Sequence, residues 1–299
     1  MKTRHLLFVA CLVPSQGLAD GISVETVSGS VSVPSSPDTV VALDLAAIDT
    51  LAALGVSISG VPAFTPPAYL GPAMDAAEPV GSLFEPDFEA LAVMAPDLII
   101  AGGRSQRMVE PLSEIAPTID MTIWGADMVG QARERISAYG AIFGTEAKAD
   151  ALLTEFDAAL SEAQAAVDGK GDALILLTNG GTVSAYGDDS RFGWLHTELG
   201  LPEAYADITA ETHGEAVSFE FIAEVDPDWI LVIDRGAAIG QAGEAAAVTL
   251  DNPLVAGTKA GQAGQIVYLD SAPIYLAAGG AQAMQITMDE ITTSFEGAD

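Results

Sequence analysis

The chain has 299 residues, of which 49% are hydrophobic and 18% are charged, so it can bury a sizeable core and does not have the composition of a disordered protein. Its 42 acidic residues stand against 11 Lys and Arg, which gives a formal net charge of −31. Such a surface repels nucleic acid and anionic lipid, so neither is an expected partner. Because cations are scarce, each arginine carries more information than usual.

The first 19 residues have the layout of a secretory signal peptide. Lys2 and Arg4 give a cationic start, residues 6–13 are apolar, and small residues precede a cleavage point after Ala19. We therefore expect a periplasmic protein whose mature chain has no cysteine and hence no disulfide. The less favoured alternative is a lipoprotein anchored through Cys11, the only cysteine.

One sequence segment occurs twice. Residues 88–104 (FEALAVMAPDLIIAGGR) align without gaps with residues 219–235 (FEFIAEVDPDWILVIDR). Each copy predicts a helix that begins at Phe-Glu, a turn at Pro-Asp and then a buried parallel strand that leads to an arginine. Helix-then-strand units of this kind indicate an α/β fold. The expected strands are residues 39–43, 57–61, 98–101, 118–124, 172–178, 229–233 and 265–269.

Between the two copies, residues 145–167 contain no Pro or Gly and place Leu152, Phe156 and Leu160 four positions apart. This pattern predicts one long amphipathic helix that Thr145 caps and that ends at Gly169. About 23 helical residues would span roughly 35 Å, a rigid link rather than a flexible linker.

The expected organisation is therefore two α/β lobes with parallel-type central sheets joined by that helix. The predicted N-terminal lobe covers residues 20–144, the bridging helix residues 145–168 and the C-terminal lobe residues 169–299. Ligands of open parallel sheets lie beyond the carboxyl ends of the strands, so we expect a cleft between the lobes there.

The scarce cations favour an anion as the ligand. Arg104 and Arg235 end the two copies of the repeat, and Arg191 lies in the loop DDSRFGW. A single arginine is usually a surface ion-pair partner, but two at matching positions in so acidic a chain point to an anion held from both lobes by charge-assisted hydrogen bonds. The sequence has no phosphate-binding loop, dinucleotide fingerprint, paired-histidine metal motif or G-x-S-x-G element, so nothing indicates an enzyme.

Two further residues could bind iron. His213 lies in the polar loop THGE and Tyr275 in the segment PIYLA. A solvated histidine and a packed tyrosine are the plain alternatives, but an imidazole and a phenolate can both bind Fe(III). His196, within a predicted helix, is expected to be structural.

At these residues the chain resembles a known family. The segments VGSLFEPDFEALAVMAPDLIIAGGRS, SRFGWLH, THGEAVSFEF, LDNPLVAGTKA and YLDSAPIYLAAGG resemble the periplasmic substrate-binding proteins of ferric siderophore ABC importers, above all the catecholate group that accepts petrobactin-like ligands. The resemblance covers nearly the whole mature chain and implies capture and transport rather than catalysis. It implies that Arg104, Arg191 and Arg235 surround an anionic catecholate, and that His213 and Tyr275 fill the two remaining iron positions when the siderophore is tetradentate.

The resemblance also assigns partners. Glu89 and Glu220, one at the start of each repeated helix, would dock on an ABC permease dimer driven by a cytoplasmic ATPase, although a carboxylate at a helix start is also simple capping. It implies a monomer with no intrinsic cofactor and a ferric siderophore as the transported ligand. The alternatives are a corrinoid, haem or divalent-metal binder on the same scaffold and, from another class, an extracytoplasmic hydrolase.

Overall fold

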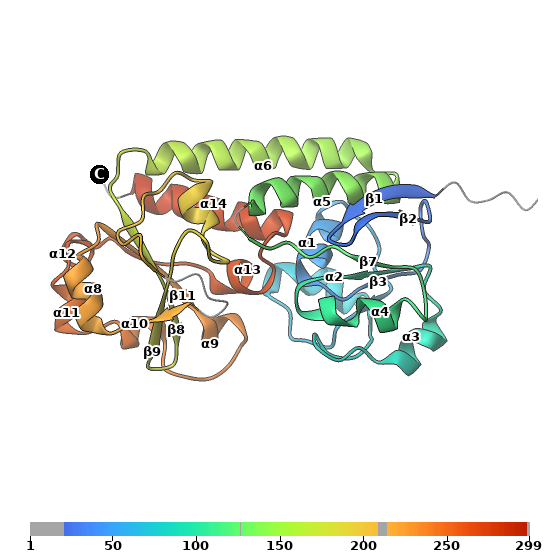
Figure 1. Ribbon diagram of the computed structural model, residues 1–299, viewed down its shortest axis with the longest axis horizontal. Coiled ribbons are helices and arrows are strands. Elements are labelled where there is room, and N and C mark those ends of the chain that lie inside the picture. Colours follow the sequence, from blue (N-terminus) through green and yellow to red (C-terminus); the bar gives the residue numbers. More distant parts are fainter. Residues whose placement is uncertain (1–20, 126, 209–213, 298–299) are drawn as a thin grey trace, which may run out of the picture.

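The computed structural model describes residues 21–125, 127–208 and 214–297. Two five-stranded sheets lie in the two halves of the chain (Figure 1). The first sheet is parallel throughout and has, in spatial order, β5 (Glu78–Pro79), β4 (Gly60–Val61), β3 (Val40–Ala42), β6 (Leu98–Ala101) and β7 (Thr118–Asp120). The second has, in spatial order, β10 (Glu215–Ala216), β9 (Thr182–Tyr186), β8 (Ala173–Asn179), β11 (Trp229–Asp234) and β12 (Ile266–Tyr268).

The predicted α/β class is thus confirmed, with one addition. In the second sheet β8, β11 and β12 are parallel, but β9 and β10 run antiparallel. The chain turns back after β8 at Gly180 and Gly181, and Gly180 has the positive φ of 59° that such a tight turn needs. The predicted strand over residues 118–124 ends early, because Asp120 Oδ1 accepts hydrogen bonds from the backbone N–H and hydroxyl of Thr122 and so begins a turn.

The remaining elements are helices and one hairpin. The hairpin consists of β1 (Ile22–Thr26) and β2 (Gly29–Val33). The helices of the first half are α1 (Leu45–Ala53), η1 (Ala68–Leu70), α2 (Gly71–Asp75), α3 (Phe88–Met94), η2 (Gly103–Met108), α4 (Val109–Leu112) and α5 (Met128–Phe143). Those that follow are α6 (Glu146–Val167), α7 (Trp194–Thr197), α8 (Phe219–Val225), α9 (Arg235–Ala238), α10 (Ala246–Thr249), α11 (Pro253–Ala256), α12 (Lys259–Ala263), α13 (Ser271–Leu276) and α14 (Ala281–Glu296).

The sequence repeat is also a structural repeat. Helices α3 and α8 both begin at Phe-Glu, and both end at a left-handed residue, Ala95 or Asp226. The conserved spacing continues into the Pro-Asp turn. The carboxylate of Asp97 accepts a hydrogen bond from the backbone N–H of Thr39 just before β3, and that of Asp228 accepts one from Asp172 just before β8. Each Asp therefore aligns its own strand with the neighbouring central strand, which explains why the Pro-Asp pair occurs in both copies.

Alternating side chains divide each sheet between two cores. Ile100 and Leu231 belong to one continuous core that runs through both halves, whereas Ile99 and Ile230 belong to a smaller core on the opposite face of their own sheet. Strand side chains alternate in direction, so each sheet is buried on both faces. The continuous core holds the two sheets in one packed body.

Long helices carry that continuous core from one half to the other. The predicted bridging helix is present as α6, which runs above both halves with α5 and α14 beneath it (Figure 1). Thr145 stands at its N-cap as predicted, but its hydroxyl has no hydrogen-bond partner in the described part of the chain. Helix α14 was not predicted and forms a second link. The predicted division into lobes at residues 144 and 169 stays a prediction.

Helix α14 is fixed at both ends. At its start, the carboxylate of Asp49 in α1 accepts hydrogen bonds from the backbone N–H of Gln282 (2.8 Å) and Ala283 (2.9 Å). At its end, Phe295 stacks on Trp229 of β11 with ring centroids 3.7 Å apart. A carboxylate at a helix N-terminus is favourable, and an aromatic pair adds to the buried area. Helix α14 therefore ties α1 of the first half to the sheet of the second half.

Asp49 makes the stability of this link depend on pH. Its side chain is fully buried, and burial raises its pKa to about 7 despite the two backbone N–H donors, which lower it. Folding therefore favours the protonated carboxyl, and that contribution is lost as the pH rises from about 4 through 7. Replacing Asp49 with Asn should flatten the fall in unfolding free energy between pH 5 and 8 by at least about 1 kcal/mol, as measured by denaturant titration. Asp289→Asn, at an exposed position of α14, is the matched control, and an equal pH slope in wild type and Asp49→Asn would refute the prediction.

Candidate functional site

The strand order fixes where the two halves can bind a ligand. In the first sheet β3 and β6 are neighbours whose following helices diverge, and Asp44 and Arg104 follow their carboxyl ends. In the second sheet β8 ends at Asn179 and β11 leads into Arg235. Such switch points are the places where open α/β sheets bind ligands. The predicted placement of Arg104 and Arg235 at the carboxyl ends of the repeated strands is confirmed.

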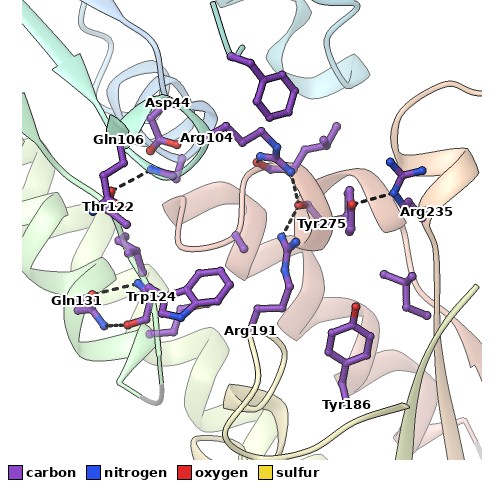
Figure 2. A pocket seen from close by; sticks show the side chains of 18 of the residues that line it. Asp44, Arg104, Gln106, Thr122, Trp124, Gln131, Tyr186, Arg191, Arg235 and Tyr275 are labelled. Carbon is purple, nitrogen blue, oxygen red and sulfur yellow. Dashed lines mark hydrogen bonds between the residues drawn. The ribbon is translucent and has the colours of Figure 1, made fainter. Parts of the chain in front are cut away.

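One cavity joins these strand ends. It has a volume of about 1030 Å³ and is lined by residues from both halves of the chain. This cavity contains all three arginines that were predicted to bind an anion, together with the tyrosine that was predicted to bind iron (Figure 2). They are Arg104, Arg191, Arg235 and Tyr275.

Two glycines allow Arg104 to reach the cavity. An added Cβ at Gly102 would lie 3.1 Å from the backbone nitrogen of Thr122 and 3.2 Å from the Asp44 carboxyl carbon. Gly103 has a φ of 52°, in the left-handed region, and its N–H donates to the hydroxyl of Thr122. Larger residues would force this turn apart, so the Gly-Gly pair brings the 3₁₀ helix η2, and Arg104 with it, close to β7.

The three arginines converge on Tyr275. Arg104 donates to the main-chain carbonyls of Leu276 (3.0 Å) and Tyr275 (3.1 Å), and Arg191 donates to the same Tyr275 carbonyl (2.7 Å). Arg235 donates through Nε to the Tyr275 hydroxyl (3.1 Å) and through Nη1 to Asn179 Oδ1 (3.2 Å). Figure 2 shows the side chains of both halves pointing at this one residue of α13. All four acceptor atoms are neutral, so these five hydrogen bonds hold the guanidinium groups in place without cancelling their charge.

Burial and neighbouring positive charge both disfavour the charged forms of two of the arginines. Burial lowers the pKa of Arg104, and Arg235 lowers it further, whereas Asp44 and Tyr275 raise it. Burial also lowers the pKa of Arg191, and the positive charge of Arg104 adds to that effect. The Nε of Arg191 is buried without a hydrogen-bond partner among the described residues. Desolvated cations that repel one another are stabilised most by a shared negative charge.

Asp44 is the acidic member of the site. It caps α1 by accepting a hydrogen bond from the backbone N–H of Ala47 (3.2 Å), and Figure 2 shows its carboxylate beside Arg104. Burial raises its pKa to about 6, although Arg104 lowers it. Asp44 therefore offsets part of the positive charge on the side of the first half, whereas Arg235 on the opposite side has the neutral Asn179 as its neighbour.

The other predicted site residues have distinct outcomes. His213 lies outside the described residues. His196 is buried, and its Nδ1 lies 2.9 Å from the carbonyl oxygen of Leu201, so it is structural as predicted. Burial lowers its pKa. Glu89 and Glu220 both lie exposed in the first turn of the repeated helices α3 and α8, at equivalent positions in the two halves.

Sequence reasoning missed several residues of the cavity. Arg107 and Trp124 line it on the side of the first half, and Tyr186 lines it on the other, where burial raises the Tyr186 pKa to about 12. Arg107 follows Arg104 by three residues, the spacing that places two side chains on one face of a 3₁₀ helix. A search of all predicted strand ends, rather than of the repeat alone, would have found Asp44 and Trp124.

The sequence profile of the periplasmic binding protein family matches residues 40–273. The chain belongs to this family. Membership confirms the predicted class of protein, a solute-binding protein rather than an enzyme. Within the described residues, no helix has both the length and the apolar character required to cross a bilayer.

Two of the similar proteins are named for the compounds that they bind. The petrobactin-binding protein YclQ of Bacillus subtilis is 35% identical over 88% of this chain and 84% of its own. The ferric-anguibactin-binding protein FatB of Vibrio anguillarum is 28% identical over 94% of this chain and 89% of its own.

Solved structures of similar proteins superpose on this chain over most of its length. The YclQ crystal structure superposes with a TM-score of 0.86 at 34% identity and covers 92% of this chain and 99% of its own. The periplasmic catecholate-siderophore binding protein VctP of Vibrio cholerae superposes with a TM-score of 0.82 at 29% identity over 91% and 99% of the two chains.

Because the clustered arginines are desolvated and repel one another, removing one of them should stabilise the ligand-free protein. Arg191→Gln removes a desolvated charge and its unpartnered Nε, so it should raise the unfolding free energy by about 1 kcal/mol relative to Arg133→Gln. The control Arg133 is also an arginine, but it forms an exposed ion pair with Asp157. Thermal and denaturant unfolding without ligand measure the difference. A less stable Arg191→Gln would mean that the cluster does not carry the electrostatic cost inferred here.

Proposed function

We propose that this chain is an extracytoplasmic binding protein that captures an anionic Fe(III)–catecholate siderophore in the cavity and delivers it to an ABC importer. The observation that carries the proposal is the convergence of Arg104, Arg191 and Arg235 on Tyr275, from both halves of the chain, in one cavity. The names of the relatives YclQ, FatB and VctP support a ferric siderophore as the ligand class.

Capture works by exchange of hydrogen-bond acceptors. Catecholate oxygens bound to Fe(III) keep negative charge and accept hydrogen bonds. When such a ligand enters, its anionic oxygens replace neutral acceptors, here the carbonyl of Tyr275 and the amide of Asn179, so that each bond then joins a cationic donor to an anionic acceptor. The guanidinium groups are already positioned by those neutral acceptors, so little side-chain entropy is lost on binding.

Tyr275 and His213 are proposed as protein ligands of the iron when the siderophore supplies only two catecholates. The Tyr275 hydroxyl lies in the cavity and accepts a hydrogen bond from Arg235, which holds its oxygen in position among the arginines. For His213 the support is its neighbour Gly214, which packs against the ring of Tyr186 in the cavity wall. An imidazole and a phenolate would complete six-coordination of the cargo.

The alternatives fit the cavity less well. A corrinoid or haem on this scaffold would not require three arginines from both halves around one tyrosine. A hydrolase would need an activated nucleophile, and the cluster instead holds its hydroxyl group, Tyr275, as an acceptor from Arg235.

The binding test uses the same arginine variant as the stability test. Wild-type protein is titrated with a ferric bis-catecholamide and a ferric tris-catecholamide, and tryptophan quenching and the charge-transfer band are followed. Arg191→Gln should weaken both complexes at least about tenfold, because it removes a charged hydrogen-bond donor, whereas Arg133→Gln should bind as wild type does. Absence of saturable binding by wild type, or full binding by Arg191→Gln, would overturn the proposed function.

The Tyr275→Phe variant tests whether Tyr275 binds the iron directly or only lines the cavity. The variant should lose most of its affinity for the bis-catecholamide complex and shift its charge-transfer band, because one iron position returns to water. Affinity for the tris-catecholamide complex, whose iron is already six-coordinate, should change less than about threefold, the worth of one neutral hydrogen bond at the low end of its range. An unshifted band with the bis-catecholamide complex would exclude direct ligation by Tyr275.

Delivery is proposed to use the repeat a second time. Glu89 and Glu220 stand exposed at equivalent places of α3 and α8, so the two halves present one carboxylate each. A two-fold symmetric permease dimer, driven by a cytoplasmic ATPase, would offer two equivalent cationic sites to them. The binding protein itself is proposed to act as a monomer in the periplasm.

The docking variant is Glu89→Arg combined with Glu220→Arg. It should bind ferric ligand with wild-type affinity but fail to support iron uptake in cells that depend on this protein. The matched control carries Arg at Glu155 and Glu162, two exposed residues of α6, and should support uptake. Uptake at the wild-type rate by the Glu89/Glu220 variant would rule out this docking mode.

A further inference from the structure

The two walls of the cavity differ in chemistry. The second half contributes Arg191, Arg235 and polar side chains such as Asn179. The first half contributes Arg104 and Arg107, and it adds three large apolar side chains that are half exposed: Val27 (52%), Phe84 (55%) and Trp124 (53%). We call these three residues the apolar rim. Large apolar groups exposed within one cavity indicate contact with an apolar part of a ligand.

Trp124 is held in place through its backbone. Its N–H donates to Gln131 Oε1 (3.2 Å), and Gln131 Nε2 donates back to the Trp124 carbonyl (2.8 Å), as Figure 2 shows. Gln131 belongs to α5 and is itself fixed by donating to the Asp127 carbonyl (3.0 Å). The indole therefore projects into the cavity from a position set by α5 and not by its own packing.

A second side chain of α5 supports the same wall one turn later. Arg135 is buried and donates to the carbonyls of Met121 (3.3 Å), Thr122 (3.4 Å) and Glu25 (2.9 Å). Residues i and i+4 share a helix face, so Gln131 and Arg135 together hold the segment from residue 121 to Trp124. The bond to Glu25 also fixes the hairpin β1–β2, which lies outside the family match and carries Val27.

We propose that Trp124 is a specificity-determining residue that stacks on an aromatic ring of the iron ligand. Gln131 is a positioning residue for Trp124. The inference rests on the proposed function and adds to it the place in the cavity where an aromatic ring of the ligand binds. An aryl ring that carries anionic oxygens fits both walls at once, because its oxygens face the arginines while its face meets the indole.

The first test compares Trp124→Phe, which keeps an aromatic face, with Trp124→Leu, which keeps only apolar volume. For the ferric bis-catecholamide complex, Trp124→Phe should bind within about twofold of wild type, and Trp124→Leu should bind about fivefold to tenfold more weakly. Residue 124 is half exposed, so neither change threatens the fold. Equal affinity of all three proteins, or an equal loss in both variants, would overturn the stacking role.

The second test observes the ring directly. Proton NMR of the diamagnetic Ga(III) bis-catecholamide complex should show upfield ring-current shifts of ligand aryl protons with wild type and Trp124→Phe, and not with Trp124→Leu. If wild-type protein binds neither the Fe(III) nor the Ga(III) complex, the proposed function fails. If it binds both but the aryl shifts are the same in Trp124→Leu, the function stands and the aryl subsite fails.

Gln131→Met tests positioning through a double-mutant cycle. The variant removes both hydrogen bonds to the Trp124 backbone, so it should weaken the bis-catecholamide complex and reduce the upfield shifts. In the Trp124→Leu background the same change should have no further effect on affinity, because its action passes through the indole. Losses that simply add would show that Gln131 acts elsewhere and would remove it from the proposal.

Discussion

One main-chain carbonyl, that of Tyr275, accepts hydrogen bonds from arginines of both halves of the chain. Arg104 comes from the first half, Arg191 from the second, and the Tyr275 hydroxyl accepts from Arg235. Like charges meet here only because a neutral acceptor lies between them and the surrounding framework is rigid. The cavity, its charge and its proposed ligand all depend on keeping these groups together in the absence of an anion.

The framework that keeps them together is helical. Helices α6 and α14 share the continuous core with both sheets, and α14 is tied to Asp49 at one end and to Trp229 at the other. Rotating one half against the other would strain two long helices and a close-packed core, which resists gradual deformation. The short helix α13, which carries Tyr275, is also in contact with α14. Ligand entry should therefore rearrange side chains more than it moves the two halves.

The sequence contained much of this architecture in its repeat. The two matched copies allowed two sheets, their central strands and the arginines at the strand ends to be predicted, because the same helix-turn-strand pattern of residues occurs in both halves. The features that escaped prediction arise from contacts between distant segments. The chain from residue 281 to 296 has the pattern of a helix, but only Asp49, more than 200 positions earlier, shows where it starts. The sequence pattern extended the predicted strand to Trp124. In the structure the strand ends at Asp120, whose carboxylate accepts hydrogen bonds from the backbone N–H and hydroxyl of Thr122.

The repeat also hides an asymmetry that matters for binding. Asp44 follows β3 in the first half, whereas Asn179 is the last residue of β8 in the second, so Arg104 has an acidic neighbour and Arg235 a neutral one. The half with the acidic neighbour is also the half with the apolar rim. Both halves line the cavity with arginines, and the first half adds the exposed apolar side chains. A ligand with a charged and a ringed part meets two different walls, which allows a pseudo-symmetric scaffold to bind it in one orientation.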